Sequence, residues 1–202
     1  MIRAFLAVDP SPSLREAIAS VQSEIKRGLH HESNRARISW VQPASIHLTL
    51  IFFGDMEERM VALLQEAITS VAAVHQPLDI PLQQIGAFPR LQAPRVLWVG
   101  PSHQWEEGET ARRFLSMQQA MAEACETLGF AREAKAFHPH LTIARIMERE
   151  RSVGDVLTAR GMNKLHVALE PLVVDSLVLM KSDLRPTGSV YTKLWDVPLK
   201  AS

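Results

Sequence analysis

The tripeptide His-Leu-Thr occurs twice, at residues 47–49 and 140–142, once in each half of the chain. Both copies lie in apolar runs, which are typical of strands. Side chains alternate between the two faces of a strand, so each histidine shares a face with the threonine two positions later. Two such pairs facing each other would supply an acid, a base and two hydroxyl donors around a small anion. That constellation suits phosphodiester chemistry without a metal.

The candidate proton-transfer groups are therefore His47 and His140, and the candidate hydroxyl donors are Thr49 and Thr142. Taken singly, each histidine is more simply explained as a strand residue bonded to a backbone carbonyl, and each threonine as a β-former. The matched arrangement favours catalysis, because site residues are judged as a constellation. Acid and base work together only if one imidazole is protonated and the other neutral, which predicts a bell-shaped rate profile.

The composition is that of an ordinary globular protein. The 202 residues are 47% hydrophobic and carry 22 basic and 22 acidic side chains, enough for one large domain or two small lobes. The balanced charge argues against broad electrostatic binding of nucleic acid, but leaves room for a local pocket that takes one end of a strand. Cys125 is the only cysteine, so we expect no intramolecular disulfide and a reducing compartment. With neither a signal peptide nor a membrane-spanning run, we expect a cytoplasmic protein without a membrane partner.

The hydrophobic pattern predicts an element order of strand, helix, strand, motif strand and helix that occurs twice, which indicates a duplicated α+β unit whose sheets meet at a cleft. Ser11 or Ser13 is a candidate cap for the first helix. Strands are predicted at 2–8, 38–41, 46–53, 78–87, 95–100, 140–146, 165–171, 174–181 and 190–196, and helices from about 11 to 27, at 57–74 and at 106–128, with a loop or short helix at 148–160.

The two motifs with their surroundings match a known pattern. The first follows Trp-Val at 40–41 and the second follows Pro139. In this setting they resemble the two-histidine phosphoesterase superfamily. Further stretches resemble its RNA 2′,3′-cyclic phosphodiesterase branch, historically called 2′-5′ RNA ligase, and the resemblance covers essentially the whole chain. These stretches are Arg-Ala-Phe-Leu-Ala-Val at 3–8, Phe-Pro at 88–89 before Val-Leu-Trp at 96–98, Ser-Asp-Leu at 182–184 and Gly-Ser-Val-Tyr at 188–191.

The resemblance implies a bilobal α+β fold over residues 1–202, with two antiparallel sheets lining a central cleft and helices on the outside. It implies that His47 is the general acid and His140 the general base, and that Thr49 and Thr142 hold the non-bridging phosphate oxygens. The implied reaction opens an RNA 2′,3′-cyclic phosphate to a 2′-phosphate without a metal or other cofactor. Ligation through a 2′-5′ bond is then a weak reverse activity.

Two further residues are candidate substrate contacts. The resemblance favours Arg145, but in a regular strand it would face away from His140, five positions earlier, and a structural ion pair is an equal alternative. Tyr191, the only tyrosine, could stack on a base or ribose, or be a core residue with a bonded hydroxyl. His138 shares strand parity with His140, but Pro139 and the lack of a nearby carboxylate or cysteine at ligand spacing argue against a metal site.

The substrate remains open at this point. We expect an RNA with a 2′,3′-cyclic phosphate end, such as a tRNA fragment, acted on by a monomer. Alternatives within the same chemistry are a small cyclic nucleotide or a 2′-5′ oligonucleotide. An RNA-end binding module without turnover is the alternative from another class, although binding alone would favour arginine over the histidine–threonine pairs.

Overall fold

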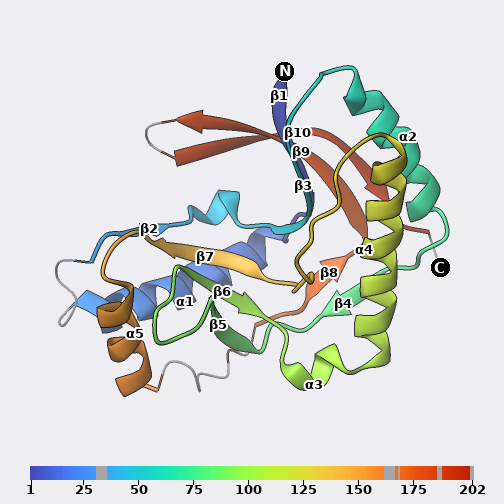
Figure 1. Ribbon diagram of the computed structural model, residues 1–202. Coiled ribbons are helices and arrows are strands. Elements are labelled where there is room, and N and C mark those ends of the chain that lie inside the picture. The colour runs from blue at the N-terminus through green and yellow to red at the C-terminus, as the bar shows by residue number, and fades with distance from the viewer. Residues whose placement is uncertain (31–35, 162–166, 168, 186–187, 201–202) are drawn as a thin grey trace.

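An antiparallel sheet of eight strands dominates the structure, a computed structural model that describes residues 1–30, 36–161, 167, 169–185 and 188–200. Within these ranges the strand order is β10-β9-β1-β3-β7-β6-β5, with β2 paired to β7, and β4 and β8 form a separate pair (Figure 1). The strands are β1 (Ile2–Val8), β2 (Ile38–Trp40), β3 (Leu48–Met56), β4 (Leu78–Ile80), β5 (Gln84–Phe88), β6 (Val96–Gly100), β7 (Leu141–Ile146), β8 (Leu172–Val174), β9 (Ser176–Arg185) and β10 (Gly188–Pro198).

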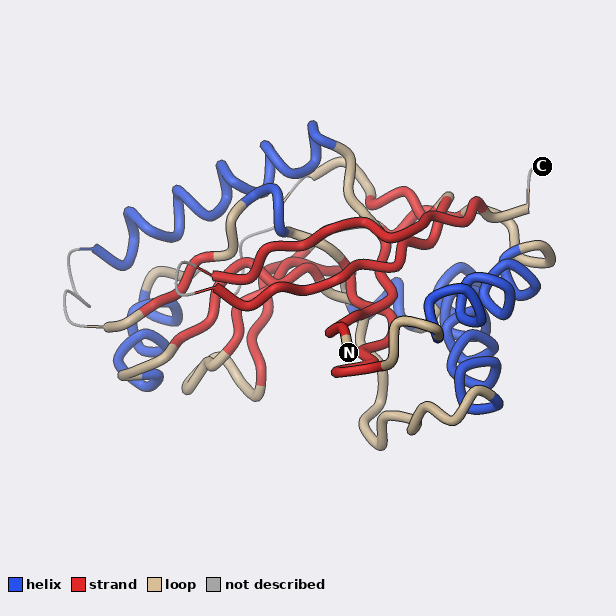
Figure 2. The backbone as a smooth tube through the Cα atoms, turned by 90° about the horizontal axis from the view of Figure 1, so that it is seen from above, coloured by secondary structure: helices blue, strands red, loops and turns tan. Residues whose placement is uncertain are grey.

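The helices lie around the strands (Figure 2). They are α1 (Pro12–His30), α2 (Met60–Ala72), α3 (His103–Glu106), α4 (Glu109–Thr127) and α5 (Glu150–Ala159), and a 3₁₀ turn spans Pro43–Ser45. α2 packs beside α4 at one side of the molecule, and α1 packs beside α5 at the other. None of the helices in the described ranges is long and apolar enough to cross a membrane.

The two halves of the sheet join where the two motifs meet. β3 and β7 share one register pair in the described residues, Leu48 with Leu141, and both leucines are buried. Strands β10, β9, β1 and β3 lie on one side of this junction, and β7, β6, β5 and β2 on the other. The α+β fold expected from the sequence is thereby confirmed, with its two antiparallel halves hydrogen-bonded into one sheet.

The junction also orients the motif side chains. Because Leu48 and Leu141 point into the core, the histidine and threonine on either side of each leucine point to the opposite face. The four side chains, His47, Thr49, His140 and Thr142, line one cavity on that face.

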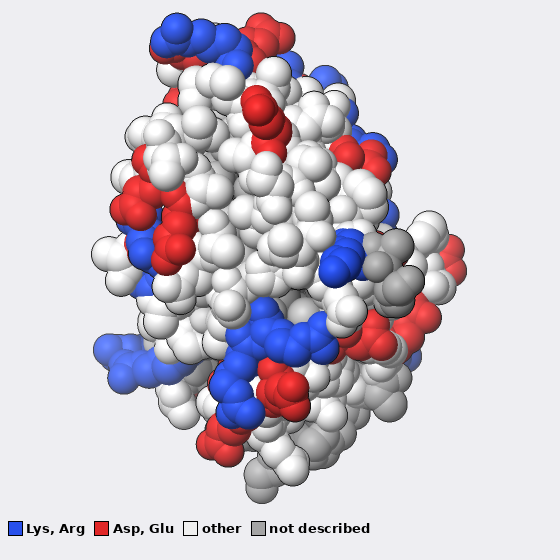
Figure 3. Space-filling view, turned by 90° about the vertical axis from the view of Figure 1, so that its right-hand side faces the viewer, with Lys and Arg blue, Asp and Glu red and all other residues white. Residues whose placement is uncertain are grey.

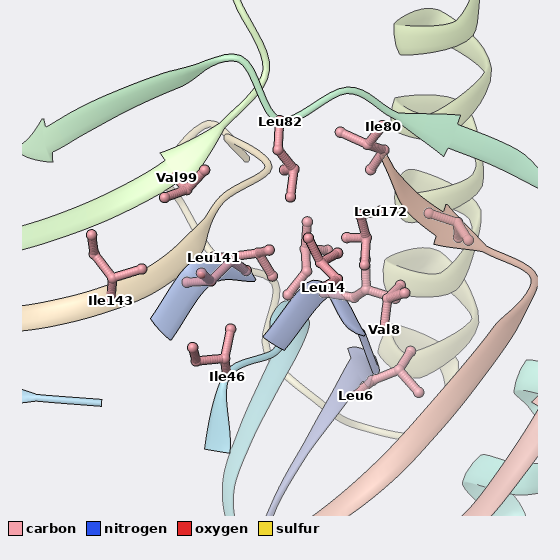
Figure 4. Packing of buried hydrophobic residues seen from close by; sticks show 14 of the residues in the cluster. Leu6, Val8, Leu14, Ile46, Ile80, Leu82, Val99, Leu141, Ile143 and Leu172 are labelled. Carbon is pink, nitrogen blue, oxygen red and sulfur yellow. The ribbon is translucent and has the colours of Figure 1, made fainter. Parts of the chain in front are cut away.

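The core fills the side of the sheet away from the motif histidines and threonines. Leu6 and Val8 of β1 converge there with Leu141 and Ile143 of β7, and Leu14 of α1 packs between them (Figure 4). The capping predicted for α1 is confirmed at Ser11, whose Oγ accepts a hydrogen bond from the Leu14 backbone N–H at 3.1 Å.

Three predicted elements differ in detail. The predicted strand 78–87 is divided into β4 and β5, because Pro81 lies between them and each pairs with a different partner. The predicted helix 106–128 is divided into α3 and α4 at Gly108. The predicted strand 165–171 falls partly outside the described residues; Val167 and residues 169–171 are not in a strand, and β8 begins at Leu172.

β7 contains a bulge that a buried glutamine anchors. In the ladder with β6, Leu97 pairs with Ala144 and Trp98 with Thr142, so Ile143 has no partner of its own. Ile143 and Ala144 are consecutive buried residues, which shows that the alternation of faces is reset there. Gln22 of α1, 2% exposed, donates from Nε2 to the carbonyl oxygens of Ile143 and Val41, both at 2.8 Å.

We expect the substitution Gln22→Leu to lower the free energy of unfolding by about 1–3 kcal/mol, because it removes the buried hydrogen bond to the Ile143 carbonyl and the part-buried one to the Val41 carbonyl. Urea denaturation measures this change. Gln119→Leu is the matched control, since it removes an exposed hydrogen bond to Glu123 and should change stability by less than about 0.5 kcal/mol. Equal effects of the two substitutions would contradict the anchoring role of Gln22.

Candidate active site

A cavity of about 330 Å³ lies where the two halves of the sheet meet, and we call it the motif cavity. The structure brings all of the predicted site residues to its wall. These are His47, Thr49, His140, Thr142, Arg145 and Tyr191.

Each motif histidine sits one residue before its strand rather than within it. β3 begins at Leu48 and β7 at Leu141, the two residues that join the halves of the sheet. In the structure these two strands therefore begin slightly later than in the predicted ranges 46–53 and 140–146. The imidazoles lie at the strand ends, beside the junction, and not in a regular ladder.

The two imidazoles make the same hydrogen bond. Nδ1 of His47 donates to the Ser45 carbonyl oxygen at 2.8 Å, and Nδ1 of His140 donates to the His138 carbonyl oxygen at 2.7 Å. A carbonyl only accepts, so Nδ1 carries the hydrogen in both rings. Nε2 is therefore the atom that each ring offers to a ligand. A hydrogen bond to a backbone carbonyl is the simpler explanation for a single strand histidine. Here the same bond also leaves Nε2 of both rings free for proton transfer.

Aromatic rings enclose both histidines. The Phe5 ring stacks on His47 with centroids 4.5 Å apart, and the Tyr191 ring meets it edge to face at 5.1 Å. At the other pair, the Phe88 ring meets His140 edge to face at 4.9 Å, and the Trp98 ring lies 6.2 Å away. Each half of the sheet thus supplies two aromatic walls for its own imidazole.

This burial lowers the pKa of both imidazoles. Removal from water is the largest cause at His47 and at His140, because it penalises the charged ring. The backbone hydrogen bonds oppose the shift, and the positive charge of Arg145 lowers both pKa values further. The remaining charges differ between the two sites. At His47 the carboxylate of Asp9 raises the pKa and the guanidinium of its ion-pair partner Arg15 lowers it, whereas at His140 the nearby His138 lowers the pKa.

Arg145 corrects the expectation drawn from strand parity. A regular strand would turn it away from the site, but it lines the motif cavity together with Thr142. The bulge at Ile143 is the reason, because one extra residue reverses the face of everything that follows it. Arg145 forms no ion pair with any described residue, so its charge is left to the cavity.

Several wall residues were not singled out from the sequence. Arg3 and Phe5 line the cavity from β1, and Ser182 and Ser189 line it from the β9–β10 hairpin. The alternation of β1 carries a signal, since Arg3 and Phe5 share one face while Leu6 points to the core. The serines lie in two of the stretches that carry the family resemblance, but periodicity does not direct them to the cavity, because their placement depends on how the hairpin packs against β1.

Comparisons with known proteins agree with this geometry. A sequence model of the 2′-5′ RNA ligase superfamily matches residues 10–185. An RNA 2′,3′-cyclic phosphodiesterase of Archaeoglobus fulgidus is 31% identical over 193 residues, which is 96% of this chain and 98% of that protein. A protein of the same name from Methanothermobacter thermautotrophicus is 29% identical over 194 residues, 96% of each chain.

Solved structures share the fold. A Thermus thermophilus protein superposes with a TM-score of 0.73 at 23% identity, covering 98% of both chains. Escherichia coli LigT in its apo form superposes with a TM-score of 0.66 at 21% identity, covering 99% of this chain and 98% of LigT. The bilobal arrangement of the sheet therefore recurs in proteins of low sequence identity.

The substitution Tyr191→Ala should raise the pKa of His47 toward its ordinary value of 6.5, because it opens one wall of the imidazole to water. Tyr191→Phe keeps the ring and should leave the pKa nearly unchanged. Titration of the imidazole resonances by NMR distinguishes these outcomes, with His140 as an internal reference. An unaltered His47 titration in the alanine variant would show that Tyr191 does not contribute to its burial.

Proposed function

The chain belongs to the 2′-5′ RNA ligase superfamily, and from this premise we propose that it hydrolyses a 2′,3′-cyclic phosphate at the end of an RNA to a 2′-phosphomonoester. The observation that carries the proposal is the matched pair of imidazoles, each fixed by a backbone carbonyl so that Nε2 is available at one cavity. The activity named for the relatives of similar length supports it. Because each half contributes one histidine and one threonine, we treat residues 1–202 as one functional unit.

In the proposed mechanism, Nε2 of His140 takes a proton from a water molecule. The water oxygen bonds to phosphorus as the bond from phosphorus to the 3′ oxygen breaks. Protonated His47 gives its Nε2 proton to the departing 3′ oxygen, which leaves the phosphate on the 2′ oxygen. This assignment of acid and base follows the one that the resemblance to the superfamily implies. If the 5′ hydroxyl of a second RNA takes the place of the water, the same two proton transfers would join the RNA ends by a 2′-5′ bond.

The threonines and Arg145 stabilise the charge that builds on the phosphate. Thr49 and Thr142 line the motif cavity with both histidines, so their hydroxyls can donate to the non-bridging oxygens of the phosphate. Arg145, on the same face, adds a positive charge without a carboxylate partner in the described part of the chain. Tyr191 completes the wall around His47 and forms the edge of the ribose site.

The first test uses a short RNA ending in a 2′,3′-cyclic phosphate, incubated in excess EDTA with product identification. We expect the parent protein to produce a 2′-phosphate, and His47→Ala and His140→Ala to lose about 10²- to 10⁴-fold in kcat/KM, because each removes one proton transfer. His103→Ala is the matched control, since this exposed histidine lies on α3 and pairs with Glu106.

A 3′-phosphate product would contradict the assigned leaving group. Activity that disappears only in EDTA would contradict metal-independent chemistry. Binding of the RNA end without turnover by the parent protein would instead identify a binding module.

The rate profile against pH should follow the lowered pKa values. In the free protein both imidazoles lose their protons below the ordinary value of 6.5, so we expect kcat/KM to be bell-shaped with its maximum below pH 6.5. A bound phosphate favours the imidazolium, so the alkaline limb of kcat should lie at higher pH than that of kcat/KM. Steady-state kinetics from about pH 4.5 to about pH 8.5 measure both limbs. A flat profile would exclude a titrating acid and base.

A further inference from the structure

The motif cavity opens into a larger hollow, which we call the outer groove. Its volume is about 1150 Å³, more than three times the 330 Å³ of the motif cavity. The two share Thr49, Phe52 and His140 as wall residues. A single small ligand occupies a pocket of about 300–1,000 Å³, so the outer groove has room for more than the reacting phosphate and its ribose.

The path continues beyond the outer groove. A third hollow of about 340 Å³ lies against α4 and shares Leu50, Phe52 and Phe137 with the outer groove. Phe52 lines all three hollows and is 44% exposed, although it is a large apolar residue. The three hollows therefore meet at Phe52 and together extend from the motif histidines to α4, which gives a chain-like ligand room to lie along them.

The walls of the outer groove combine aromatic faces with positive charge. Phe52, Phe88 and Phe137 supply the rings. The walls include four basic side chains and two carboxylates. One basic side chain and one carboxylate pair with each other, Arg95 with Glu150 at 3.8 Å. The remaining basic residues have no carboxylate partner in the described part of the chain and are exposed, and the remaining carboxylate is Glu133 at the rim. These basic residues are Arg90, Lys135 and Arg151.

We propose that the outer groove holds the nucleotides that precede the cyclic phosphate, so that the protein acts on oligonucleotide ends in preference to cyclic mononucleotides. The inference rests on the proposed function, because it takes the motif cavity as the site of the cyclic phosphate. A 2′,3′-cyclic phosphate occupies the 3′ end, so the rest of the RNA extends in the 5′ direction only. Aromatic faces for unstacked bases and basic side chains for the backbone are what single-stranded RNA requires.

A second basic hollow serves as an internal comparison. It has a volume of about 420 Å³, is lined by Arg112, Arg113 and Lys200 among others, and shares no wall residue with the motif cavity. Figure 3 shows the side of the molecule that carries α2 and α4, where basic side chains gather in the lower part of the view. Exposed basic residues thus occur both at the outer groove and away from it, and substitutions at the two places can be matched in number and charge.

The experiment compares kcat/KM for 2′,3′-cyclic CMP with kcat/KM for di-, tetra- and hexanucleotides that end in the same cyclic phosphate. We expect the tetranucleotide to exceed the mononucleotide by about tenfold or more, since stacked bases and backbone contacts add binding energy. The triple variant Arg90→Ala, Lys135→Ala and Arg151→Ala should abolish most of this ratio. It should also reduce the slope of log kcat/KM against log salt by roughly 2 for the tetranucleotide, at about 0.7 per lost phosphate contact.

The control triple variant, Arg112→Ala, Arg113→Ala and Lys200→Ala, should keep the length ratio of the parent within about twofold. A parent without any preference for length would overturn the proposal, as would a groove variant with an unchanged ratio or a control variant with the same loss. Failure of the proposed function is a different result, namely that the parent turns over neither the mononucleotide nor the oligonucleotides. Thermal unfolding of both triple variants verifies that these exposed substitutions leave the fold intact.

Discussion

The pairing of Leu48 with Leu141 is the constraint on which the rest of the structure depends. These leucines are the central residues of the two motifs, and both are buried in the core below the sheet. Hydrophobic burial therefore fixes the orientation of the polar residues beside them, because neighbours along a strand point to opposite faces. One buried contact thus joins the two halves of the sheet and at the same time collects two histidines and two threonines at one cavity.

The aromatic surroundings of the two imidazoles have opposing effects on the site. The aromatic walls hold the rings in place and exclude water, but the same burial disfavours the charged form that an acid needs. The backbone bonds at Nδ1 partly compensate and fix the tautomer. Beside His47, the charges of Asp9 and Arg15 act on the imidazole pKa in opposite directions.

The sequence predicted the members of the site better than the shape around them. Periodicity and the repeated tripeptide brought His47, Thr49, His140 and Thr142 to one place, because their positions depend only on local strand alternation and on one pairing. Strand parity alone turned Arg145 away from the site, although the resemblance favoured it as a substrate contact. Parity failed because the bulge at Ile143 depends on pairing with β6 and on the contact of Gln22 on a distant helix. The aromatic walls were not predicted as a set, because Phe88 and Trp98 reach His140 only through the folded sheet.

Strand β1 contributes to both the hydrophobic core and the motif cavity. Ala4, Leu6 and Val8 fill the core on one face, while Arg3 and Phe5 form the wall of the cavity on the other. A substitution that shifts the backbone of this strand therefore affects the core and the cavity together. The exposed positions of β10 and of the outer groove carry no such double duty. Changes to the cavity that leave the core untouched are therefore easier to make at its exposed margin than in β1.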